Sequence, residues 1–278
     1  MKVIVAEHAG FCFGVQRALQ MVMKASEEHT PLYTLGPLIH NPQVVEKLQC
    51  AGIEVVRDVS EVKEGWIVMP SHGVPKEVKK AAEQAGLRVV DVTCPFVAKV
   101  QKRAAELAAM GFQVVVVGDP GHSEVKGILS AAGDDAIAIS KPEEIENRDW
   151  PERVGVVAQT TQVGERLNEI VNRIEEKGCE VQSFDTICYA TTDRQRAVLE
   201  LAPKVECLVV VGGRNSANTA RLREICEATG LPTYHVETAD EIDQSWFEGK
   251  SVVGLSAGAS TPDWIIDEVK KRLEGLAG

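Results

Sequence analysis

The stretch Gly10-Phe11-Cys12-Phe13-Gly14-Val15 decides the predicted fold, because its setting recurs twice along the chain. Cys12 follows the apolar run Val3-Ile4-Val5-Ala6 and precedes a pattern typical of a helix. Cys94 and Cys188 have the same setting, each after a strand-like run and before a helix-like run. Three cysteines between a strand and a helix predict a threefold internal repeat.

Spacing along the chain supports this repeat. The residues 28 positions after the three cysteines are His40, His122 and Ser216, and each lies in a polar loop after a predicted strand. The last repeat lacks one strand, and the segment Lys2-Val3-Ile4-Val5 at the start of the chain supplies one. We therefore expect modules at residues 14–94, 95–187 and 188–278, the third completed by residues 1–13.

Alternating strands and helices predict an α/β fold with mainly parallel sheets. In such sheets ligands bind at the carboxyl ends of the strands, where free N–H groups at helix starts attract anions. Each module has two polar loops beside its cysteine. We expect the three cysteines and the six loops to converge on one central cavity.

Composition and charge exclude several function classes. The chain has 278 residues, 44% hydrophobic content and a formal net charge of -11, and it has no basic run, which excludes a nucleic-acid or anionic-membrane partner. The first apolar run is too short for a signal peptide, and no segment approaches the roughly 20 apolar residues of a membrane span. The sequence thus predicts a cytoplasmic protein, and without a heptad seam we expect a monomer.

The seven cysteines are predicted to be reduced thiols, because their number is odd and they are scattered through a chain without a secretion signal. No CxxC pair occurs, so the zinc-ribbon and thioredoxin motifs are absent. Cys50, Cys179, Cys207 and Cys226 lie in or beside apolar patterns and are predicted to be small buried hydrophobes. For the three repeated cysteines, three interpretations stay open. They could hold a [4Fe-4S] cluster, which normally takes four thiolates and would keep one iron open. They could hold zinc together with a water, or they could be buried thiols at strand ends.

The loop residues indicate an anionic ligand. Neutral or weakly basic donors suit a phosphate or diphosphate held by hydrogen bonds, although any one Ser, Thr or Asn is also explained as a helix N-cap. Glu124 lies beside His122 and could be a general acid with a raised pKa, or a first-turn glutamate that stabilises a helix dipole. The donors are His40, His72, His122, Thr160, Thr161, Ser216, Asn218, Ser260 and Thr261.

Together these motifs resemble the LytB/IspH family of 4-hydroxy-3-methylbut-2-enyl diphosphate reductases. The resemblance covers nearly the whole chain in family order. The matching stretches are Gly10-Phe11-Cys12 with Gly14-Val15, His40-Asn41-Pro42, Ser71-His72-Gly73, Asp91-Val92-Thr93-Cys94-Pro95, Gly121-His122-Ser123-Glu124-Val125, Gln159-Thr160-Thr161, Ile187-Cys188-Tyr189-Ala190-Thr191, Asn215-Ser216 with Asn218-Thr219, and Ala257-Gly258-Ala259-Ser260-Thr261-Pro262.

The resemblance implies three α/β modules in a trefoil around a central iron-sulfur cluster. It implies the last step of the non-mevalonate (MEP) isoprenoid route, in which an allylic hydroxyl is removed reductively to give isopentenyl and dimethylallyl diphosphate. Cys12, Cys94 and Cys188 would ligate a [4Fe-4S] cluster whose fourth iron binds the substrate hydroxyl oxygen. Glu124, with Thr160 and His122, would supply the proton that turns the hydroxyl into water.

The remaining implied roles concern the diphosphate and the electrons. Reduced ferredoxin or flavodoxin would supply single electrons. Many family members have a serine where this chain has Ala217, so one diphosphate hydrogen bond is expected to be missing or to be replaced by a bond from a backbone N–H. A sensor that holds an iron-sulfur cluster or zinc and binds a phosphorylated ligand without turnover is the alternative, and it would have no need of Glu124 as an acid. The implied diphosphate ligands are His40, His72, His122, Thr160, Thr161, Ser216, Asn218 and Ser260.

Overall fold

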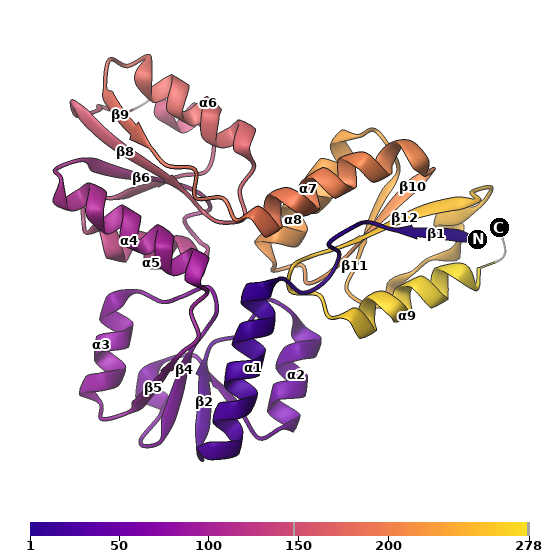
Figure 1. Ribbon diagram of the computed structural model, residues 1–278, viewed down its shortest axis with the longest axis horizontal. Coiled ribbons are helices and arrows are strands. Elements are labelled where there is room, and N and C mark those ends of the chain that lie inside the picture. Colours follow the sequence, from indigo (N-terminus) through magenta and orange to yellow (C-terminus); the bar gives the residue numbers. More distant parts are fainter. Residues whose placement is uncertain (147, 277–278) are drawn as a thin grey trace. The chain divides into compact units, whose positions relative to one another are not determined.

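The computed structural model describes residues 1–146 and 148–276 (Figure 1). The chain divides into two compact units, which are described separately. The first unit comprises Met1–Gln16, Ile39–Glu46 and Tyr189–Gly278, and the second comprises Arg17–Leu38 and Lys47–Cys188.

Among the described residues, three four-stranded sheets carry the fold, one in the first unit and two in the second. All strand pairs are parallel, which confirms the predicted α/β class with parallel sheets. In spatial order, the first-unit sheet is β1 (Lys2–Val5), β12 (Val252–Ala257), β10 (Cys207–Val211) and β11 (Thr233–Val236). The second-unit sheets are β3 (Glu54–Val56), β2 (Leu32–Leu35), β4 (Trp66–Met69) and β5 (Arg88–Asp91), and β7 (Ile137–Ile139), β6 (Gln113–Val117), β8 (Arg153–Ala158) and β9 (Glu180–Ser183).

The three sheets share one strand order, with β1 in the edge position that β5 and β9 hold in theirs. Strand β1 pairs with β12 from Lys2 opposite Val252 to Val5 opposite Leu255, and Figure 1 shows the two strands side by side. The N-terminal strand therefore joins the last sheet, the place predicted from the missing strand. Each of these edge strands leads the chain toward one of the repeated cysteines.

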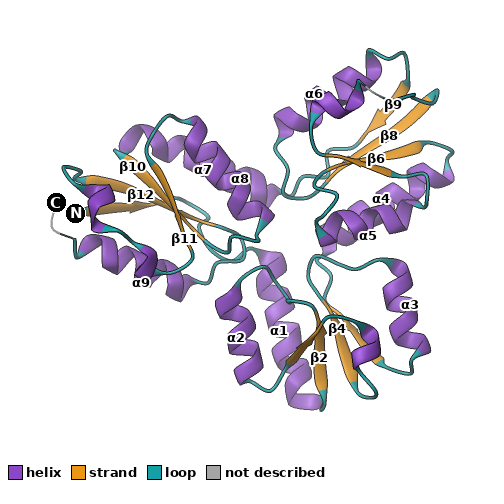
Figure 2. Ribbon diagram, turned by 180° about the vertical axis from the view of Figure 1, so that it is seen from behind, coloured by secondary structure: helices purple, strands orange, loops and turns teal. Residues whose placement is uncertain are grey.

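Helices connect the strands, and in the first-unit sheet they lie against both faces. Figure 2 shows α7 (Tyr189–Leu201) and α8 (Ala217–Ala228) on one side of this sheet and α9 (Asp263–Glu274) on the other. The helices are α1 (Phe13–Glu28), α2 (Pro42–Cys50), α3 (Lys76–Gln84), α4 (Pro95–Ala109), α5 (Ser123–Ala132), α6 (Gly164–Glu175), α7 (Tyr189–Leu201), α8 (Ala217–Ala228) and α9 (Asp263–Glu274). Short 3₁₀ helices lie at Val59–Glu61, Pro142–Ile145, Ala202–Lys204, Ala239–Glu241 and Gln244–Phe247.

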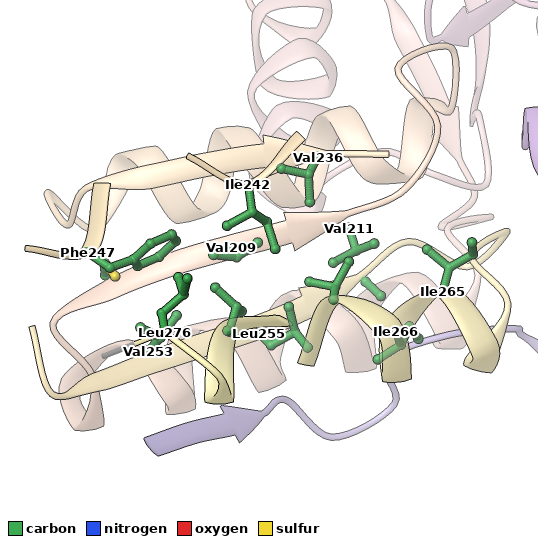
Figure 3. Close-up of a cluster of buried hydrophobic side chains, with 14 residues drawn as sticks. Val209, Val211, Val236, Ile242, Phe247, Val253, Leu255, Ile265, Ile266 and Leu276 are labelled. Carbon is green, nitrogen blue, oxygen red and sulfur yellow. The ribbon is translucent and has the colours of Figure 1, made fainter. Parts of the chain in front are cut away.

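Strand β10 is buried on both faces of the first-unit sheet. Val209 and Val211 point to the α9 side, where they pack with Leu255, Ile266 and other apolar side chains (Figure 3). Leu208 and Val210 point to the α7 side. Each such side chain contributes about 1.5 to 3 kcal/mol when fully buried. Burial on both faces fixes the strand ends, and with them the loops that carry the polar residues.

The strand before Cys188 is shorter than predicted. The strand-like run that precedes Cys188 in the sequence extends from Val181 to Ile187, but β9 ends at Ser183. Side chains that follow β9 make hydrogen bonds with backbone groups instead. The carboxylate of Asp185 accepts the N–H of Ile187 at 3.0 Å. The Thr186 hydroxyl accepts the N–H of Ala158 at 2.8 Å and donates to its carbonyl at 2.7 Å. Such side-chain bonds compete with a strand ladder.

Within the described part of the chain, no helix combines the length and the hydropathy that a bilayer crossing requires.

Candidate active site

The three repeated cysteines are held by the same backbone contact. In each case the cysteine N–H donates to the carbonyl two residues after the end of a strand, namely β12, β4 or β8. Identical contacts in three modules show that the repeat extends to the geometry of the cysteine loops. The donors and acceptors are Cys12 to Ala259 at 3.1 Å, Cys94 to Ser71 at 2.8 Å, and Cys188 to Thr160 at 3.0 Å.

All seven cysteines are free thiols, and their surroundings separate them into two groups. Cys12, Cys94 and Cys188 are half-buried in loops. Cys207 and Cys226 are fully buried, and burial raises the pKa of their thiols to about 11 and about 12. They are the inert hydrophobes predicted for them. Cys179 and Cys50 differ from the prediction that they are buried. Cys179 is only half-buried. Cys50 is exposed at the end of α2, so the prediction is wrong for Cys50.

The candidate cluster ligands are distributed over both units, with Cys12 in the first and Cys94 and Cys188 in the second. Over residues 1–146 and 148–276, no three or more His, Cys, Asp or Glu side chains are grouped so as to hold a metal ion. The joint use of the three thiolates stays a prediction from the sequence. Their chemistry fits an iron-sulfur cluster, because soft thiolates without disulfide partners are the ligands that such clusters take.

The first unit brings together His40, Ser216, Asn218 and Ser260, which we call the first-unit polar group. The Ser260 hydroxyl lies 3.3 Å from the His40 carbonyl oxygen and 3.4 Å from the Ser216 hydroxyl. The Asn218 side-chain oxygen accepts the N–H of Ala259 at 2.9 Å, while its buried Nδ2 has no protein hydrogen-bond partner in the described residues. A buried amide with free donors is suited to an anionic ligand.

Two other features of this unit limit which residues contact a ligand. Thr261 is one of the predicted loop donors, but its hydroxyl donates to the carbonyl of Val211 at 3.0 Å. This hydroxyl therefore bonds to the last residue of strand β10 instead of to a ligand. His40 is neutral, because burial lowers the pKa of its imidazole. A neutral ring can take part in hydrogen bonds but not in an ion pair.

Gly213 allows the His40 loop to approach the Ser216 loop. A Cβ at Gly213 would lie 2.5 Å from the backbone carbonyl oxygen of His40, so any side chain would push the two loops apart. Overpacking of this kind costs about 1 to 3 kcal/mol. We therefore expect Gly213→Ala to weaken binding of an allylic diphosphate by about 10- to 100-fold, measured by isothermal titration. Gly164→Ala is the control, because a Cβ there meets nothing within 4 Å, and equal affinities for the two variants would contradict the argument.

Glu124 and Thr160 form a buried pair in the second unit. The Thr160 N–H donates to Glu124 Oε1 at 2.7 Å, and its hydroxyl lies 2.9 Å from Oε2. Glu124 is 3% exposed. Burial raises the pKa of Glu124 to about 7, although the two bonds from Thr160 act in the opposite direction. A carboxyl with this pKa can carry and release a proton near neutral pH.

His122 and His72 lie close to this pair. The Nδ1 atom of His122 accepts the N–H of Glu124 at 3.1 Å and caps α5, so the neutral ring carries its proton on Nε2. The ring centroids of His72 and His122 are 6.4 Å apart. Thr161 is half-buried next to Thr160. The structure thus places His72, His122, Glu124 and Thr160 in the second unit with two of the repeated cysteines.

The raised pKa of Glu124 makes stability depend on pH. The folded state holds this proton up to about pH 7, whereas an ordinary glutamate releases it near 4.5. The contribution of this proton to the free energy of unfolding is therefore fully present below pH 4.5 and is lost as the pH rises through 7. At about 1.4 kcal/mol per pKa unit, the loss is about 3 kcal/mol. We expect Glu124→Gln to lose less stability than the wild type between pH 5 and pH 8 in urea unfolding. The exposed first-turn variant Glu165→Gln should follow the wild type, and identical pH profiles for all three proteins would contradict the prediction.

Sequence reasoning missed several supporting residues. His235 lies outside the loop motifs, and its Nε2 atom is 2.8 Å from the carbonyl oxygen of Gly212 at the start of the Ser216 loop. The supporting glycines could have been found from the sequence, because a glycine lies 24 positions after each repeated cysteine. Gly36, Gly118 and Gly212 each donate their N–H to the last residue of the neighbouring strand, at 2.7, 2.9 and 3.0 Å.

Comparison with known proteins adds to this geometry. The family model described as LytB protein matches residues 3–274 of the chain. The chain belongs to this family. A 4-hydroxy-3-methylbut-2-enyl diphosphate reductase of Pelobacter propionicus is 49% identical over 273 residues, covering 98% of each chain. One of Geobacter sp. (strain M21) is 49% identical over 277 residues, covering 99% of this chain and 98% of that protein.

Solved structures of LytB relatives resemble the whole chain. One, of (E)-4-hydroxy-3-methyl-but-2-enyl diphosphate reductase, described as the terminal enzyme of the non-mevalonate pathway, is 44% identical, covers 99% of each chain and has a TM-score of 0.72. Another, of the reductase from Plasmodium falciparum, is 25% identical and has a TM-score of 0.92, covering 98% of this chain and 87% of that one. The resemblance stated from the motifs is confirmed at the level of the family.

Proposed function

We propose that this LytB-family chain is a 4-hydroxy-3-methylbut-2-enyl diphosphate reductase. The observation that carries the proposal is the position of Thr160. Its N–H and hydroxyl bond to the buried acid Glu124, while its carbonyl accepts the N–H of Cys188. A proton donor is thus linked through one residue to a candidate cluster ligand. A protein that only binds a phosphorylated ligand has no need of such a pair.

The reaction replaces a C–OH bond by a C–H bond. Two electrons and two protons enter, and the hydroxyl leaves as water with one of the protons. Glu124 holds that proton with its pKa near 7, and the Thr160 hydroxyl beside Oε2 offers it a path out of the buried site. The neutral His122, with its proton on Nε2, presents a second donor in the same unit.

The proposed cofactor is a [4Fe-4S] cluster with Cys12, Cys94 and Cys188 as its protein ligands. When bound, such a cluster supplies electrons one at a time and an iron with an open position that acts as a Lewis acid. We infer that a reduced ferredoxin or flavodoxin delivers those electrons. The zinc alternative supplies no electrons and would leave the chain unable to carry out this reduction.

We propose that the diphosphate binds through the hydrogen-bond donors predicted from the sequence. The buried Nδ2 of Asn218, which has no protein hydrogen-bond partner among the described residues, supports this assignment. Hydrogen bonds to an anion are stronger than bonds between neutral groups. The ligands are His40, Ser216, Asn218 and Ser260 from the first-unit polar group, and His72, His122, Thr160 and Thr161 from the second unit.

Ala217 gives a specific prediction for this set. It is the first residue of α8, directly after the N-cap Ser216. A serine there would add one hydroxyl donor at the helix start. We expect Ala217→Ser to tighten diphosphate binding by about 1 kcal/mol, roughly fivefold, without changing the turnover number. A KM lowered at unchanged kcat supports this assignment, and an unchanged KM would show that the position does not contact the diphosphate.

The experiment for the proposed function is an anaerobic assay. The purified brown protein is supplied with a chemical one-electron reductant and 4-hydroxy-3-methylbut-2-enyl diphosphate, and the two products are separated by chromatography. Formation of isopentenyl and dimethylallyl diphosphate with reductant consumed at two electrons per product is the expected result. A colourless zinc protein, or a brown protein that binds the substrate without converting it, would contradict the proposal.

A further inference from the structure

Arg194 is buried in the first unit but has no part in the proposed function so far. It lies on α7, the helix that begins directly after Cys188, and it is 4% exposed. Arginine is rarely buried to this degree, because removing its charge from water is costly unless strong hydrogen bonds compensate. The contacts of this guanidinium therefore need an explanation.

The guanidinium joins two backbone segments next to repeated cysteines. Its NH2 group donates to the carbonyl of Gly10 at 2.6 Å, and its NH1 group donates to the carbonyl of Ala190 at 2.6 Å. Gly10 precedes Cys12 by two residues, and Ala190 follows Cys188 by two residues. The planar fork of arginine can bond to two acceptors at once, which a lysine ammonium on a flexible stem does less well.

Gly10 itself is held in a fixed conformation. Its φ of 98° is a value that other residues rarely adopt, and a Cβ there would lie 2.8 Å from the carboxylate of Asp263. Two residues later, the N–H of Cys12 donates to Ala259. The Cys12 loop is therefore bonded to Arg194 on α7 before the cysteine and to the Ser260 loop at the cysteine.

A small cavity places the same arginine beside Cys12. This cavity of about 200 Å³ is lined by Cys12 and Arg194, together with Phe11, Phe13 and Tyr189 among others. The guanidinium stays protonated at any physiological pH. The charge and hydrogen bonds near an iron-sulfur cluster set its reduction potential. A fixed positive charge favours the reduced form, because reduction adds negative charge.

We propose that Arg194 is a positioning residue of the cysteine site, which holds the Cys12 loop on the first turn of α7 and places a permanent positive charge beside Cys12. The inference rests on the proposed function, since it concerns the cluster assigned there. The Arg194 side chain contributes in two ways. Its hydrogen bonds to two carbonyls keep the Cys12 loop in place, and its positive charge raises the reduction potential of the cluster.

The test compares Arg194→Met, Arg194→Lys and Arg196→Met. Arg196 lies on the same helix, but its side chain is 66% exposed and pairs with Asp193 and Glu200 at the surface, so its variant is the control. Two properties of the anaerobic, cluster-loaded proteins are measured. The first is the rate at which iron is lost to a chelator, and the second is the midpoint potential from a redox titration followed by electron paramagnetic resonance.

We expect Arg194→Met to lose iron at least several-fold faster than the wild type and to have a more negative potential. Arg194→Lys should keep a potential near that of the wild type but still lose iron faster, and Arg196→Met should match the wild type in both. Arg194→Met with wild-type rate and potential overturns the proposal. If that variant fails to fold by circular dichroism, Arg194→Lys decides, and iron loss at the wild-type rate then overturns it. A wild-type chain that binds no iron would instead overturn the proposed function itself.

Discussion

Glu124→Gln is expected to lower turnover by about 100- to 10,000-fold, the range that a positioned general acid contributes. Gln has nearly the same shape and can still accept the Thr160 N–H through its carbonyl oxygen, but it cannot release a proton. The substitution removes none of the proposed cluster ligands and none of the proposed diphosphate ligands. Substrate affinity and iron content should therefore stay near the wild-type values, while product formation nearly stops.

The pH dependence of the wild type adds a second readout of the same acid. With a pKa of about 7, Glu124 is protonated below neutral pH and ionised above it. The rate limited by proton donation should fall as the pH rises through 7. Steady-state assays between pH 6 and pH 8.5 measure this, with Glu165→Gln as the matched control. Glu124→Gln with wild-type turnover would rule out the acid role and would favour a ligand-binding protein over an enzyme that uses this proton.

Replacing any one of Cys12, Cys94 or Cys188 by Ala is expected to abolish reductase activity and remove most of the bound iron. A cluster with three protein thiolates loses a third of its protein ligands in each variant, and hydrogen bonds from residues around the ligands cannot replace a missing sulfur. Iron and sulfide are measured after anaerobic purification. The three variants should behave alike, because the three cysteines share one backbone contact.

The other thiols provide the controls for this series. Cys50→Ala changes an exposed residue and should leave iron content and stability unchanged. Cys226→Ala removes a fully buried side chain, and its cost should appear in stability rather than in iron content. Loss of iron on replacing Cys50, Cys179, Cys207 or Cys226 would show that the ligands were wrongly assigned.

The cysteine spacing predicted much of the fold because the repeat has a simple physical basis. Each module needs a buried apolar strand, a loop and a helix start in the same order, and buried strands such as Cys207–Val211 are recognisable from unbroken apolar runs. The edge position of β1 followed from counting strands. The module boundaries proposed at residues 94 and 187 stay a prediction, since the compact units divide the chain elsewhere.

The details that the sequence did not predict depend on contacts between distant residues. Nothing in the local pattern shows that Thr160 would bond to Glu124, 36 positions earlier, or that Arg194 would reach Gly10 across 184 positions. The early end of β9 at Ser183 depends on the side chains of Asp185 and Thr186, which a count of apolar residues ignores. Cys50 was misassigned because an apolar neighbourhood in the sequence does not fix which face of a helix end is exposed.

The central claim is that one thiolate from each repeat binds the same iron-sulfur cluster and that one iron lacks a protein thiolate. Mössbauer spectroscopy of the ⁵⁷Fe-loaded chain, with and without the substrate, tests it most directly. The claim predicts one iron in four with parameters distinct from the other three, and a change at that iron alone when the substrate is added. Four equivalent irons that do not respond to substrate, or a chain that takes up no iron, would contradict it.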